Sequence, residues 1–140
     1  MSLAKPTDPK SWSISTIVEP DGPACFAFAD SDLDVAAASP VEQLLAAVGS
    51  CFGQSCIAMM RYHAWPVLAV ELVVKGHKPA GPLIGKGLDT LEIFAHFCGA
   101  ISVERQQRLL ADAKKVCTVT NSLSSAIMIT VKTVETAPAL

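Results

Sequence analysis

The sequence predicts an α+β fold in which strands come in groups and two helices stand between the groups. Alternation of apolar and other residues near both ends and in the middle of the chain is typical of strands. A Ser-Pro helix start opens a long apolar run in the first half. A Gly/Pro-rich stretch separates the two central strands. Because strands and helices do not alternate regularly, the order favours α+β over a parallel βαβ architecture.

The N-terminal part is expected to form a β-hairpin. Apolar or β-branched side chains recur at every second position from Trp12 to Val18, and the alternation resumes from Cys25 to Ala29. The intervening Glu-Pro-Asp-Gly-Pro at 19–23 carries the residues that turns favour.

A long helix is predicted from Ser39 to about His63. Ser39 is the expected cap, Pro40 suits the first helical position, and Glu42 completes a capping box. Pro66 ends the helix, because the residue before a proline is disfavoured in helical conformation. Few polar residues interrupt this segment, so we expect the helix to be buried on nearly all sides, partly by a second subunit.

Two strands are predicted next, at Val67–Lys75 and Leu91–Cys98, with a loop over Gly76–Gly87 between them. Ser102 is expected to cap a second helix of about fourteen residues that ends at Cys117. The apolar face of this helix should contain Leu109, Leu110, Ala113 and Val116. Alternation over Ile127–Val134 predicts a closing strand.

The composition narrows the class of protein. A length of 140 residues suits a single domain over 1–140, and 51% apolar against 17% charged residues favours a homo-oligomer. A net charge of -2 with no run of Lys or Arg argues against nucleic-acid and anionic-membrane partners. The segment 52–74 is interrupted by polar residues and proline, and no export signal is recognised, so we expect a cytoplasmic protein.

Five cysteines stand at 25, 51, 56, 98 and 117, with no CxxC pair and no His/Cys spacing typical of zinc. We therefore expect no metal site, no cofactor and no disulfide framework. Cys51 and Cys56 lie about 140° and about 7.5 Å apart along a helix, beyond the ~7 Å reach of a disulfide, so Cys56 is interpreted as a packing residue. Cys25 and Cys98 are also interpreted as structural.

Cys51 differs from the other cysteines because Gly49, Ser50 and Gly53 surround it in mid-helix. Small residues there lower helix propensity and allow close approach of another group. Tight helix packing and a reactive site explain them equally well. Cys117 ends a helix after two lysines whose charge favours a thiolate, whereas the helix dipole opposes it.

The segment Ser39–Cys51, read as SPVEQLLAAVGSC, followed by AKKVC at 113–117 and a last strand, resembles the OsmC/Ohr family. That family comprises osmotically inducible protein C, the organic hydroperoxide resistance proteins and uncharacterised OsmC-like relatives, and this chain is most similar to the last group. The resemblance extends from about Trp12 onward and includes the order of the elements.

The resemblance implies an intertwined homodimer with an OsmC-like fold and active sites at the subunit interface. It further implies a thiol peroxidase in which Cys51 is the peroxidatic cysteine and Cys117 the resolving cysteine. The Cys51 thiolate would reduce an organic hydroperoxide and become a sulfenic acid, Cys117 would form a disulfide with it, and an external dithiol would reduce that disulfide.

The family pattern also includes an activating Arg in the hairpin and a Glu directly after the helix-opening proline. This chain has Val41 at that place and no Arg before Arg61, and capping suffices to explain Glu42. Five other groups are candidates to activate the thiol: Arg105, Arg108, Lys114, His63 and His96.

Two alternative functions remain beside the peroxidase. One, favoured by the missing Arg and Glu, is a catalytically weak or inactive protein that binds a small apolar ligand at the dimer interface, and the other is a purely structural interaction module.

Overall fold

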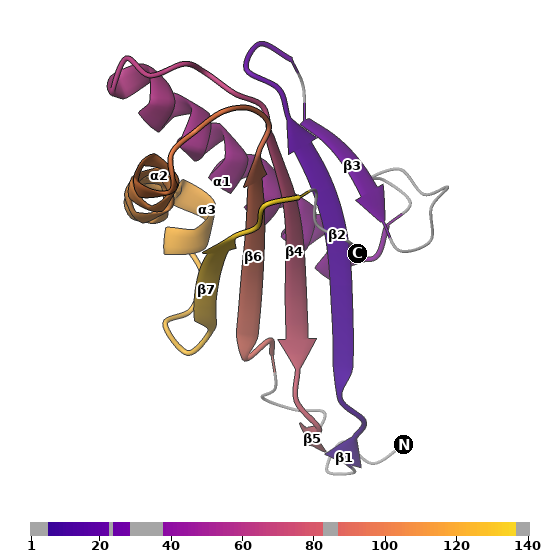
Figure 1. The fold of residues 1–140 in the computed structure, drawn as a ribbon. Helices are drawn as coiled ribbons and strands as arrows, with labels where there is room; N and C mark the ends of the chain where they lie inside the picture. Colours follow the sequence, from indigo (N-terminus) through magenta and orange to yellow (C-terminus); the bar gives the residue numbers. More distant parts are fainter. Residues whose placement is uncertain (1–5, 23, 29–37, 83–86, 137–140) are drawn as a thin grey trace.

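The computed structural model describes residues 6–22, 24–28, 38–82 and 87–136. Figure 1 shows a mixed five-stranded sheet with the helices packed on one of its faces. In chain order the elements are β1 (Pro6–Thr7), β2 (Lys10–Val18), β3 (Ala24–Phe28), α1 (Pro40–Tyr62), β4 (Val70–Lys78), β5 (Gly81–Pro82), β6 (Thr90–Phe97), α2 (Val103–Val116), α3 (Thr118–Asn121) and β7 (Met128–Thr133). The predicted α+β class is therefore confirmed.

The sheet has the strand order β3-β2-β4-β6-β7, and a separate pair joins β1 to β5. Neighbouring strands run antiparallel except β6 and β7, which are parallel. The predicted N-terminal hairpin is present, with Ile14 opposite Phe28 and Val18 opposite Ala24. Ala29, the predicted end of its second strand, lies outside the described residues.

Helix α1 begins and ends where the sequence predicts. The Ser39 hydroxyl accepts a hydrogen bond from the Glu42 N–H at 3.2 Å, and the Ser39 N–H donates to the Glu42 carboxylate at 3.1 Å. This reciprocal pair is the capping box. After Tyr62 the chain leaves the helix through Ala64, whose φ of 57° is left-handed. The Trp65 N–H donates back to the Met60 carbonyl, which closes the last turn.

One face of α1 lies against the sheet, and the opposite face is open. Leu45, Phe52 and Met60 are fully buried, whereas Ala47 and Ala58 are exposed in the single chain. The expectation that α1 is buried on nearly all sides is thus met where the sheet, α2 and α3 cover it, and one face remains exposed in the single chain. By length and composition α1 could cross a membrane, but its inner face is part of the core that the sheet covers.

Two glycines set the distance between α1 and the sheet. A Cβ atom on Gly49 would lie 2.8 Å from Thr16 Cγ2, and one on Gly53 would lie 2.6 Å from Val18 Cγ2. Both distances are too short for carbon–carbon contact, so only glycine permits this approach. Of the two explanations for small residues around Cys51, close packing accounts for the glycines, and the surface they pack on is the sheet of the same chain.

Helix α2 has the predicted length and the predicted Ser102 cap. Leu109, Leu110 and Ala113 are buried as expected, but Val116 is 50% exposed. The prediction for Val116 was wrong because α2 ends at that residue, and the chain directs the next side chain, Cys117, into the core.

The central strands differ from the prediction at their ends. β4 begins at Val70 rather than Val67, because the preceding residues cross from α1 to the sheet and the Leu68 N–H contacts the Met60 sulfur at 3.3 Å. β4 also continues through Gly76 to Lys78, inside the predicted loop. Gly76 marks a close approach rather than a turn, since a Cβ there would lie 3.1 Å from Leu45 Cδ2. Part of the predicted loop, residues 83–86, lies outside the described residues.

Candidate active site

Cys51 lies in the middle of α1, at the border between its buried and exposed faces. Its neighbour Phe52 is fully buried, whereas Gln54 on the next turn is exposed. Cys51 itself is half-buried. The Cys51 carbonyl accepts a hydrogen bond from the Ser55 hydroxyl at 2.7 Å, so this polar side chain bonds to the backbone of its own helix. Part of Cys51 is therefore accessible, while its side chain also packs against the buried core.

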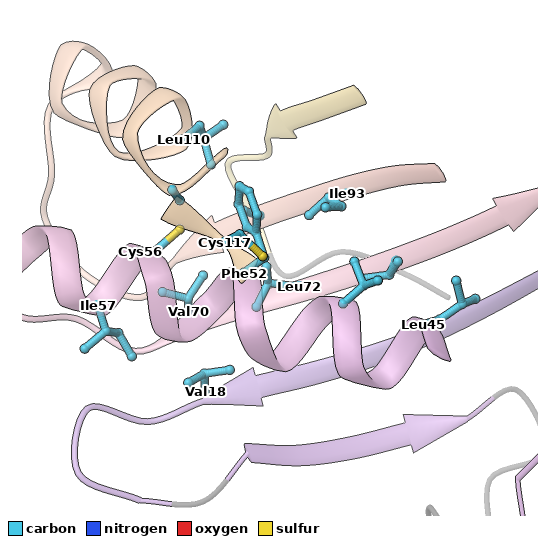
Figure 2. Packing of buried hydrophobic residues seen from close by; sticks show 14 of the residues in the cluster. Val18, Leu45, Phe52, Cys56, Ile57, Val70, Leu72, Ile93, Leu110 and Cys117 are labelled. Atoms are coloured by element: carbon cyan, nitrogen blue, oxygen red, sulfur yellow. The ribbon is translucent and has the colours of Figure 1, made fainter. Parts of the chain in front are cut away.

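Cys117 lies at the junction of α2 and α3 and has no exposed surface. Its backbone N–H donates to the Ala113 carbonyl at 2.8 Å, and its carbonyl accepts from the Asn121 N–H at 3.1 Å. These bonds join the end of one helix to the start of the next. Figure 2 shows the Cys117 side chain among the buried residues around Phe52 of α1. The junction thus directs a thiol toward the central helix.

The structure brings Cys51 and Cys117 together. Burial raises the pKa of the Cys117 thiol, and the neighbouring Cys51 thiol raises it further. The hydroxyl and backbone N–H of Thr120 act in the opposite direction and favour the Cys117 thiolate. Sequence reasoning missed Thr120, whose only signal was its place three residues after Cys117. The buried Cys117 is therefore held as a thiol next to a more exposed one.

The other three cysteines differ in their surroundings. Cys56 is fully buried, as expected of a packing residue, and burial followed by the nearby Cys117 raises the pKa of its thiol. Cys98 is half-buried on the sheet. Cys25, which was interpreted as structural, is exposed on β3, so it does not contribute to the core. All five cysteines are free.

The charged groups proposed to activate Cys51 bond elsewhere. Arg108 Nε donates to Asp112 Oδ2 at 3.0 Å, and His63 Nε2 lies 3.0 Å from the same oxygen. Arg105 stacks over the Trp65 ring, 4.7 Å from its centroid. The remaining two groups bond to backbone carbonyls, Lys114 to that of Ile129 and His96 to that of Val134. Glu42 is held in the capping box, as expected.

A prominent cleft lies away from the thiol pair. It has a volume of about 840 Å³ and lies near the start of α1, where Trp12, Ser39, Glu42 and His77 are among its lining residues. Cys51 and Cys117 do not line it. This cleft is therefore separate from the thiol pair.

The chain is similar in sequence to a known protein family. The family model described as "OsmC-like protein" matches residues 30–132. A search of the curated proteins gave no significant match.

Solved structures with the same fold share few residues with this chain. An organic hydroperoxide resistance protein OsmC from Legionella pneumophila is 16% identical, with a TM-score of 0.62, and the alignment covers 86% of this chain and 95% of that one. An OsmC-like protein from Mycoplasma pneumoniae is 17% identical, with a TM-score of 0.65 and coverage of 91% and 95%.

A third structure contains a bound small molecule. It is a putative organic hydroperoxide resistance protein from Vibrio cholerae with captopril in one of its active sites. It is 17% identical to this chain, with a TM-score of 0.62 and coverage of 77% and 81%. At these identities the three structures establish the fold and leave the activity to be argued from the residues of this chain.

Proposed function

The chain belongs to the OsmC-like protein family, and from that premise we propose that it reduces organic hydroperoxides with Cys51 and Cys117 as its redox pair. One observation carries the proposal: two thiols from distant parts of the chain lie close together, Cys117 within the buried core and Cys51 packed against that core. One of them is half-buried and the other fully buried. A peroxidatic cysteine must meet substrate, whereas a resolving cysteine need only meet the peroxidatic one.

The proposed reaction has three balanced steps. The Cys51 thiolate attacks one oxygen of the hydroperoxide, the O–O bond breaks, and after proton uptake an alcohol leaves and a sulfenic acid remains. The Cys117 thiol then displaces the sulfenic oxygen as water and forms the Cys51–Cys117 disulfide. An external dithiol reduces that disulfide by exchange and becomes oxidised itself. The apolar residues beside Cys51 favour an organic hydroperoxide over hydrogen peroxide.

The test maps the thiols after a single oxidation. Reduced protein receives one equivalent of tert-butyl hydroperoxide, free thiols are then alkylated, and peptides are identified by mass spectrometry. We expect a Cys51–Cys117 disulfide in the unmodified chain and a trapped Cys51 sulfenic acid in Cys117→Ser. Cys56→Ser is the matched control, because Cys56 also lies near Cys117 but should not be needed. Cys51 and Cys117 both remaining free would falsify the proposal.

A second candidate function is binding of a small apolar ligand without turnover. It is favoured by Arg105, Arg108 and Lys114 of α2, which bond to groups other than Cys51. A thiol with no cationic neighbour is expected to react slowly. This function predicts slow alkylation of Cys51 by iodoacetamide at neutral pH and a ligand retained through purification. Rapid alkylation that persists at acidic pH would count against it.

We also propose that two copies associate through the open face of α1. That face carries small residues, among them Ala47 and Ala58, which allow close helix packing. Cys51 borders the same face, so a second copy would enclose the thiol and complete an apolar site for the hydroperoxide.

A further inference from the structure

Three potential ligand residues gather on the face of the sheet that the helices do not cover. Glu71 lies on β4, His96 lies on β6, and Cys98 directly follows the end of β6. One ligand atom from each residue lies within 4.8 Å of the other two. All three side chains are half-buried, so they are shielded from solvent but not enclosed.

The backbone holds this cluster in place. Glu71 and His96 are directly paired across the antiparallel β4 and β6 strands. The Cys98 N–H donates to the Ala69 carbonyl at 2.9 Å, which extends the ladder one step beyond β6. Side chains alternate along a strand, and Val70, Phe97 and their alternating neighbours point into the core. The three ligand residues therefore share the outer face.

His96 is oriented as metal-binding histidines are. Its Nδ1 lies 3.2 Å from the Val134 carbonyl oxygen. Because a carbonyl oxygen only accepts, Nδ1 must carry the hydrogen, and in the neutral ring Nε2 holds the free lone pair. Histidine ligands commonly donate their second ring N–H to a backbone carbonyl, which fixes the tautomer and the ring orientation.

Negative charge accumulates beside His96. The Glu71 carboxylate lies beside the Cys98 thiol, and Glu19 is close enough for its charge to act on the same thiol. Within the described residues, neither carboxylate takes part in a salt bridge. A bound cation would offset both charges and displace the thiol proton.

We propose that Glu71, His96 and Cys98 form a binding site for a divalent transition metal ion of the zinc type. One sulfur, one imidazole nitrogen and one carboxylate oxygen suit Zn²⁺ or Co²⁺ rather than Mg²⁺ or Ca²⁺, which take oxygen ligands. Tetrahedral ligand atoms lie roughly 3.3–3.8 Å apart, so small side-chain rotations would close the site. Water or Glu19 would take the fourth position.

Spacing along the sequence could not reveal this site. Linear zinc motifs place ligands a few residues apart, whereas here the strand pairing of β4 with β6 brings a glutamate to a His-x-Cys segment. The site lies on the opposite face of the sheet from α1, so it is separate from the Cys51–Cys117 pair.

The test is a cobalt titration followed by zinc competition. It uses the reduced full-length chain, both unmodified and as a Cys51→Ser, Cys117→Ser double variant that removes the other thiol pair. We expect one Co²⁺ per chain, with thiolate-to-cobalt charge-transfer absorption in the near ultraviolet that Zn²⁺ abolishes. In the double-variant background, Cys98→Ser should remove this band, and His96→Gln should weaken cobalt affinity at least about tenfold.

The matched control is Cys25→Ser, which removes an exposed thiol elsewhere on the sheet and should leave the titration unchanged. Circular dichroism verifies that each variant is folded. Absence of the band in the double variant, or its persistence in Cys98→Ser, would overturn the metal site. Peroxide-induced disulfide formation is measured without metal, so the two proposals fail independently.

Discussion

The partner of Cys51 is a property of the fold rather than of local sequence. Helix geometry excludes Cys56 as a disulfide partner from spacing alone, and Cys56 is fully buried as that argument expects. The same reasoning cannot find Cys117, because it lies at the junction of α2 and α3 and meets Cys51 only through tertiary packing. Resemblance to a known family supplied that pairing, and the structure places the two thiols together.

Replacing Gly53 by alanine is expected to destabilise the packing of α1 on the sheet. In Gly53→Ala the new Cβ would lie 2.6 Å from Val18 Cγ2 and 3.0 Å from Leu72 Cδ1, so α1 or β2 would have to move. Overpacking costs about 1–3 kcal/mol, and the gain in helix propensity returns about 1 kcal/mol. We expect a net loss of up to about 2 kcal/mol in unfolding free energy, measured by urea denaturation.

The control for this substitution is Gly87→Ala, because a Cβ on Gly87 would meet nothing within 4 Å. Its unfolding free energy should change by less than about 0.5 kcal/mol. Equal effects of the two substitutions would mean that close packing of α1 on the sheet is not what Gly53 provides.

At the scale of elements, signals confined to a few residues were the most reliable. The Ser39 and Ser102 caps fixed the starts of both long helices, since capping depends on hydrogen bonds within one turn. Strand ends were less reliable because they depend on distant residues. Gly76 was interpreted as part of a loop, yet it continues β4 where Leu45 of α1 needs room. The short helix α3 had no signal of its own.

The contact of His63, at the end of α1, with Asp112 of α2 should make the unfolding free energy decrease at acidic pH. The hydrogen bond from His63, followed by Arg108, lowers the pKa of Asp112, which is 8% exposed. Because the pKa of Asp112 is lower in the folded state than in the unfolded chain, where it is about 3.9, the ionised carboxylate stabilises the fold above that pH. This stabilisation is lost as the pH falls through the folded-state pKa. Unfolding free energy should therefore fall below about pH 4 more steeply in the unmodified protein than in Asp112→Asn.

At neutral pH, Asp112→Asn should lower the unfolding free energy by about 1 kcal/mol, chiefly through the His63 bond, because Arg108 is 63% exposed and its pair is screened. Asp21→Asn provides the comparison, since Asp21 pairs with Arg61 at a fully solvated position and is 95% exposed. An identical acid profile for all three proteins would show that the α1–α2 contact does not depend on Asp112.

At the scale of the whole molecule, the sequence predicts the class and order of the elements but not how the strands pair. The parallel pairing of β6 with β7 follows from the crossover through α2 and α3, which no alternation pattern encodes. Two consequences of strand and helix packing were equally hidden. One is the Glu71–His96–Cys98 cluster, and the other is the bond that Arg108 makes to Asp112 rather than to Cys51.

The open face of α1 provides the test of assembly. If two copies pack through this face, the protein should elute from a sizing column with light-scattering detection at twice its 14.7 kDa chain mass. Ala58→Glu places an unpaired charge on that face, which should cost about 3 kcal/mol and weaken dimerisation roughly a hundredfold. Ala111→Glu makes the same change on the exposed surface of α2 and should leave the dimer intact. A chain that stays dimeric with glutamate at position 58 would place the interface elsewhere, and Cys51 would then have to react at an open helix surface.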